Sequence, residues 1–89
     1  MQYIKCKIFW KEEHCNLKNR VFLFCINSKC MSGRITEVEE LEREGDYEIK
    51  VNFIDQNYFE EEAIVGNKIT IQEAFEVLSE GEITWANKG

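Results

Sequence analysis

The stretch TIQEAFEVLSEG, residues 70–81, decides the fold class that the sequence predicts. Thr70 and Glu73 have the spacing of a capping box, in which two side chains bond backbone N–H groups at the start of a helix. The apolar residues that follow recur at helical spacing and are Ile71, Ala74, Phe75 and Leu78. Gly81 stands where a left-handed residue often ends a helix. The pattern predicts one α-helix over about residues 71–80.

Outside this stretch, alternation of apolar and polar residues predicts β-strands. Tyr3–Trp10 and Tyr47–Ile54 alternate cleanly, and the apolar run within Arg20–Asn27 indicates a central strand buried on both faces. Tyr58–Val65 and Glu82–Ala86 are expected to pair beside them. We therefore predict a single α+β domain, with a small, mostly antiparallel, meander-like sheet of about five strands and one helix.

The segment Arg34–Arg43 supports two interpretations. Ile35, Val38 and Leu41 are spaced by three, which indicates a helix, and a capping box is available at its start. A strand at this position would instead complete a simple meander between the strands on either side. We favour the strand, preceded by a connection over residues 28–33.

Length and charge limit the classes of protein to consider. Eighty-nine residues form one domain, and a hydrophobic fraction of 44% is sufficient for a packed core. The formal net charge is −6. Residues 1–34 hold seven basic and two acidic residues, whereas residues 35–89 hold four basic and fifteen acidic ones, so the two parts carry +5 and −11. This polarity indicates either attraction between the two halves or one strongly negative face that meets a basic partner.

The N-terminus lacks the features of a signal peptide, and no apolar run reaches the length of a membrane span. We therefore expect a cytoplasmic protein with no membrane partner, in which all four cysteines are reduced. Cys6 and Cys25 lie in apolar strands and are expected in the core. Cys15 and Cys30 lie in loop-like segments and are expected to be accessible.

No catalytic or metal-binding pattern stands out in the sequence. The cysteines lack the tight pairing typical of structural zinc sites, apart from the Cys25–Cys30 spacing. His14 and Cys15 are neighbours in sequence, but a catalytic pair must be aligned in space. Phosphate-binding loops and nucleophile elbows are absent from the sequence. We expect a non-enzymatic protein with no catalytic residue, metal ligand or cofactor.

The acidic tract is the most distinctive feature of the sequence. Residues 37–48 contain seven carboxylates, and three more follow on the next predicted strand. Concentrated like charge destabilises a fold unless a partner offsets it, so we predict an acidic binding surface. Its residues are Glu37, Glu39, Glu40, Glu42, Glu44, Asp46, Glu48, Glu60, Glu61 and Glu62.

Three functional hypotheses follow from these patterns. The first is a small inhibitor, of the immunity-protein, antitoxin or phage counter-defence type, that docks its acidic surface onto a basic site of a larger protein. The second is a nucleic-acid- or metal-binding module that uses the basic N-terminal strands or the cysteines, although the pI of 4.8 makes nucleic acid the weaker choice. The third is an accessory subunit that joins a larger assembly through an edge strand, with Tyr3 and Trp85 as interface aromatics.

Overall fold

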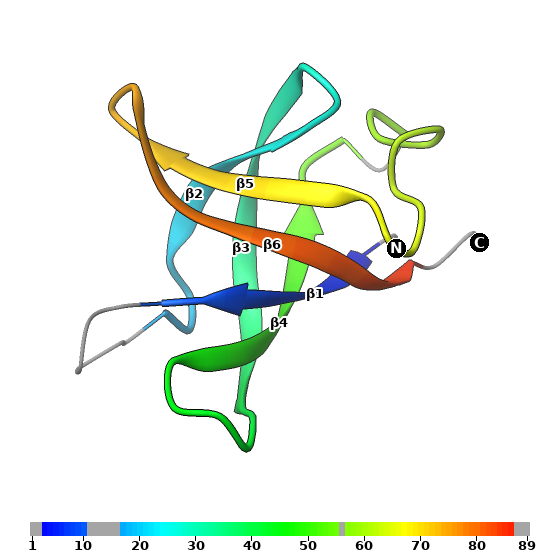
Figure 1. Cartoon of the computed structure of the whole chain (residues 1–89). Coiled ribbons are helices and arrows are strands. Elements are labelled where there is room, and N and C mark those ends of the chain that lie inside the picture. Colours follow the sequence, from blue (N-terminus) through cyan, green and yellow to red (C-terminus); the bar gives the residue numbers. More distant parts are fainter. Residues whose placement is uncertain (1–2, 11–16, 56, 87–89) are drawn as a thin grey trace.

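The fold is a closed barrel of antiparallel strands (Figure 1). The structure is a computed structural model that describes residues 3–10, 17–55 and 57–86. Its strands are β1 (Tyr3–Phe9), β2 (Val21–Ile26), β3 (Lys29–Glu40), β4 (Asp46–Phe53), β5 (Lys68–Glu73) and β6 (Glu76–Ala86). The described residues contain no helix, so the predicted α+β class is wrong, whereas the antiparallel pairing is confirmed.

The predicted helix over residues 71–80 is instead the β5–β6 hairpin. The two strands pair from Lys68 opposite Glu82 to Glu73 opposite Glu76. The apolar residues that face the core here repeat with period two and are Ile69, Ile71 and Ile83. A helix would bury Phe75 and Leu78 together, but both are exposed. An extended chain places Ile69 and Ile71 on the same inner face of the barrel, and the burial of both side chains favours the hairpin.

Gly81 has a different role from the helix-ending residue predicted. It pairs with Ile8 in the β1–β6 ladder, where the two backbones approach closely. A Cβ atom at this position would lie 2.5 Å from the carbonyl oxygen of Lys7 and 2.7 Å from Cγ2 of Ile8. The absence of a side chain therefore allows β6 to reach β1 and close the barrel.

The strand order around the barrel is β1-β4-β3-β2-β5-β6. Strands β2, β3 and β4 follow one another in space, and β1 lies beside β4, as in a Greek key. The long connection over residues 54–67 then brings β5 next to β2, and β6 closes the ring on β1. Closure leaves no free edge among the described strands, so an accessory subunit would have to dock through another contact than an edge strand.

Strand β2 and its turn differ from the sequence prediction. Phe22, Phe24 and Ile26 face the core, while Val21 and Leu23 are exposed, so β2 is buried on one face only. The predicted connection at residues 28–33 is wrong, because a two-residue turn at residues 27 and 28, with positive φ at both, leads directly into β3.

A disulfide joins Cys25 to Cys30 across the β2–β3 hairpin. The two residues are cross-strand partners, which brings their side chains together on one face. The expectation of four reduced thiols is therefore wrong for this pair. Cys6 remains a free thiol in the core, as predicted, and Cys15 lies outside the described residues.

The remaining strand predictions divide into two groups. The predicted strands at β1 and β4 are confirmed. The segment Arg34–Arg43 is strand up to Glu40, where β3 ends, as favoured. The predicted strand Tyr58–Val65 is wrong, since residues 57–62 form turns. Phe59 and Ala63 from these turns still pack into the core. The described residues include no helix that is long and apolar enough to cross a membrane.

Candidate docking site

The turn between β3 and β4 builds a hollow at one end of the barrel. The backbone N–H of Leu41 donates to the carbonyl of Asp46, and that of Asp46 donates to the carbonyl of Arg43. Gly45 adopts a φ of 88°, and its carbonyl oxygen accepts a hydrogen bond from the N–H of Trp10 at 2.8 Å. These bonds fix the turn against the end of β1 and define a hollow of about 740 Å³.

Aromatic side chains form one wall of this hollow. Phe9 and Trp10 line it from the end of β1, and Tyr47 lines it from the start of β4. Trp10 is buried and packs against Phe22 with ring centroids 5.9 Å apart, whereas Phe9 is 45% exposed. A Cβ atom on Gly45 would lie 2.6 Å from the Phe9 ring, so the missing side chain lets the turn pack directly on this ring.

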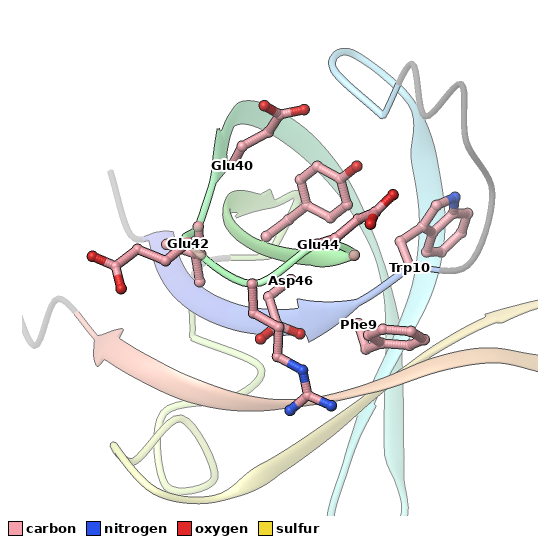
Figure 2. Close-up of a pocket in the computed structure, with 10 residues that line it drawn as sticks. Phe9, Trp10, Glu40, Glu42, Glu44 and Asp46 are labelled. Atoms are coloured by element: carbon pink, nitrogen blue, oxygen red, sulfur yellow. The ribbon is translucent and has the colours of Figure 1, made fainter.

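Carboxylates form the rim. Glu40, Glu42 and Glu44 are exposed around the turn, with Glu44 on the side of Phe9 and Trp10 (Figure 2). Within the described residues none of the three forms a salt bridge. Asp46 also lines the hollow but is buried, and its carboxylate lies 3.7 Å from the Nζ atom of Lys7. Arg43 is the only cation among the lining residues.

The other predicted acidic residues lie outside this hollow, and Glu39 and Glu48 are cross-strand partners in the β3–β4 ladder. Glu37 forms a salt bridge with Lys50 at 3.2 Å, and Glu48 accepts a hydrogen bond from Thr84 at 3.1 Å. Glu39 is exposed one residue before the hollow.

Glu60, Glu61 and Glu62 lie in the connection after β4, at the other end of that strand from the hollow (Figure 1). Glu62 forms a salt bridge with Lys29 at 3.2 Å, and Glu60 and Glu61 are exposed. The ten predicted residues therefore do not form one surface. Glu40, Glu42, Glu44 and Asp46 share the hollow at the β3–β4 turn, whereas Glu37, Glu39 and Glu48 line a smaller one of about 100 Å³ between β3 and β4.

No protein-family model and no curated protein matches this sequence. The chemistry of the hollow must therefore carry the functional argument. Glu44 lies on the side of the aromatic rings, whereas Glu40 and Glu42 extend away from them (Figure 2). The negative charge of the rim attracts a cation, and the ring faces supply cation–π contacts. The aliphatic part of a Lys or Arg side chain can lie along Leu41 and Tyr47 while its charged end meets the rim.

The basic strands and the cysteines offer less to a ligand. Lys7 and Lys50 are neutralised by Asp46 and Glu37, and the Lys50 ammonium also lies 4.0 Å above the Tyr3 ring. Among the residues that the structure describes, no group of three His, Cys, Asp or Glu side chains can hold a metal ion. His14 lies outside the described residues.

The sequence patterns identified the rim but not the aromatic wall. The alternation along Tyr3–Trp10 predicts an inward Trp10, whose ring does pack in the core, and the sequence suggests Phe9 as a stacking residue for a nucleic acid rather than as the wall of an acidic hollow. The available signal was the position of Phe9 in β1, since it follows Lys5 and Lys7 on the outward face of an alternating strand.

Proposed function

We propose that this protein is a non-enzymatic binding protein whose β3–β4 end docks onto a basic site of a larger protein. The observation that supports the proposal best is the hollow, because it combines unpaired carboxylates with aromatic side chains. An Arg or Lys side chain of the partner enters the hollow, and neighbouring basic residues meet Glu39 and the rim. An inhibitor of the immunity-protein or antitoxin type would act in this way by covering the basic site of its target.

A basic partner fits this site better than a nucleic acid does. The rim repels phosphate, and Lys7 and Lys50 already have carboxylate partners. Electrostatic attraction between the rim and a basic surface speeds association and makes binding salt-sensitive.

The variant Glu40→Gln/Glu42→Gln/Glu44→Gln tests the proposal. A peptide with two arginines separated by glycine serves as the first probe, with titration followed by NMR of the Phe9, Trp10 and Tyr47 signals. Wild type should shift these signals at low salt, and the variant should bind about tenfold more weakly, since exposed ion pairs contribute about 0.2–1 kcal/mol each and three carboxylates are removed. The same proteins then serve as bait in quantitative affinity capture from the native host.

The control is Glu60→Gln/Glu61→Gln/Glu80→Gln, which removes the same charge from exposed positions outside the hollow. If both variants lose binding equally, overall charge rather than the hollow is responsible and the proposal is wrong.

The proposed location is the cytoplasm, where cellular thiols reduce accessible disulfides, so each titration is run with and without reductant.

A further inference from the structure

A second surface, on the outer face around β2, carries an unusual apolar projection. Phe75 at the tip of the β5–β6 hairpin is fully exposed, with a relative accessibility of 106%. Its φ is 70° and that of Ala74 is 49°, a left-handed pair that natural hairpins usually fill with Asn and Gly. Backbone strain of this kind persists where function requires the side chain. The turn therefore holds a large aromatic ring away from the barrel.

A shallow apolar hollow lies on the other side of β2. Its volume is about 290 Å³, which is sufficient for a phenyl ring. Val21, Phe53 and Ile54 provide apolar walls, and Arg34 lies at its margin. Val21 and Ile54 are 50% and 87% exposed, so this surface is uncovered in the isolated chain.

Exposed apolar side chains connect the projection with the hollow. Leu23 of β2 pairs with Gln72 of β5, which pairs in turn with Val77 of β6. An irregularity in the β5–β6 ladder leaves Leu78 beside Val77, and both are exposed. The projection, the connecting row and the hollow thus form one continuous outer surface, with β2 between its two ends.

This surface carries opposite charges at its two ends. Glu73 and Glu76 face each other across the hairpin next to Phe75, which is unfavourable for like charges. Arg34 lies at the hollow, where its side chain donates to the carbonyl of Asn19. Within the described residues none of these three side chains forms a salt bridge. One end of the surface is therefore acidic with a projection, and the other is basic with a recess.

We propose that this surface binds a second copy of the same chain in a two-fold symmetric dimer. In a two-fold symmetric dimer the same surface of both protomers is in contact, with the two copies running in opposite directions. The projection of each protomer then lies on the recess of the other. Phe75 enters the recess between Val21 and Ile54, and Arg34 meets Glu73 and Glu76 of the other copy. The glutamates beside Phe75 disfavour an anionic membrane as the occupant.

Sedimentation velocity of the full chain from about 10 µM to about 1 mM tests the dimer. Wild type should shift from monomer to dimer across this range. Phe75→Gly should raise the dissociation constant about tenfold or more, since it removes the central aromatic anchor. Glycine suits the left-handed turn, so the fold is retained and thermal unfolding of the variant confirms this.

Two controls make the experiment specific. Ile64→Ser removes an exposed apolar side chain outside this surface and should leave dimerisation unchanged. Arg34→Glu and Glu73→Arg/Glu76→Arg should each weaken the dimer, and a mixture of the two variants should restore it, because both contacts then join opposite charges. A wild-type protein that stays monomeric at about 1 mM, or a Phe75→Gly variant that dimerises normally, would overturn the inference. Neither result bears on the hollow at the β3–β4 end, which contains none of these residues.

Discussion

The barrel interior changes the acidity of one side chain, the thiol of Cys6. It lies on the inner face of β1 with no exposed surface. Burial raises the pKa of its thiol to about 12 from an ordinary value of 9.0, and the nearby Glu48 carboxylate adds to the effect. The thiol therefore stays protonated and unreactive while the barrel is folded. At this scale the sequence pattern was correct, because alternation along β1 placed Cys6 inward.

The raised pKa of Cys6 predicts a specific dependence of stability on pH. Between pH 9 and pH 12 the unfolded chain loses the thiol proton and the folded chain keeps it. The stabilisation that the buried Cys6 thiol gives to the folded state is complete below pH 9 and decreases as the pH rises. At pH 10 the free energy of unfolding is lower by about 1 kcal/mol for this reason.

Urea unfolding of a Cys15→Ser protein at pH 8 and pH 10, with and without the additional change Cys6→Ala, measures this contribution. The protein that retains Cys6 should lose more stability between the two pH values than the protein that lacks it. Equal losses would show that Cys6 titrates normally.

The β5–β6 hairpin shows how an element can contradict its local sequence pattern. Residues 70–81 satisfy the spacing of a capped helix, yet they form two strands and a tight turn. Ile69 and Ile71 join Ile83 in the core only if the chain is extended there. Burying these side chains gains more free energy than the weak local preference for helix.

The turn of this hairpin gives a prediction about stability. Replacing Ala74 by Asn and Phe75 by Gly supplies the residues that two left-handed positions favour. We expect the free energy of unfolding to rise by about 1 kcal/mol, since each such substitution relieves strain without removing a buried contact. Thermal and urea unfolding at low protein concentration provide the measurement. A loss of stability would mean that Phe75 supports the monomer fold.

Closure of the barrel determines the properties of the whole molecule. Each strand has two neighbours, so the sheet exposes side chains rather than backbone groups to partners. Closure also places the two acidic segments at opposite ends of β4, whose eight residues span about 26 Å. The β3–β4 end is consequently the place where carboxylates and aromatic side chains line one hollow.

Gly81 is the position at which closure can be tested. Gly81→Ala places a methyl group against the backbone of Lys7 and should cost about 1–3 kcal/mol by separating β6 from β1. The comparison is Gly66→Ala, where a φ of 97° is unfavourable for alanine but the space is open. Hydrogen exchange should show faster opening of the β1–β6 pairs in Gly81→Ala alone. If both variants behave alike, the close approach at Gly81 is not important for closure.

The sequence alone predicts the inward residues of β1 and β4 and the acidity of the β3–β4 turn, but it leaves Arg34–Arg43 open between strand and helix. The features it predicts depend on neighbours in the chain, where period-two alternation and clustered charge are directly visible. Contacts between distant segments make residues 70–81 a hairpin, bring Cys25 to Cys30 and line the acidic hollow with aromatic side chains. These outcomes depend on which distant strands pair, and pairing maximises burial over the whole barrel rather than local preference.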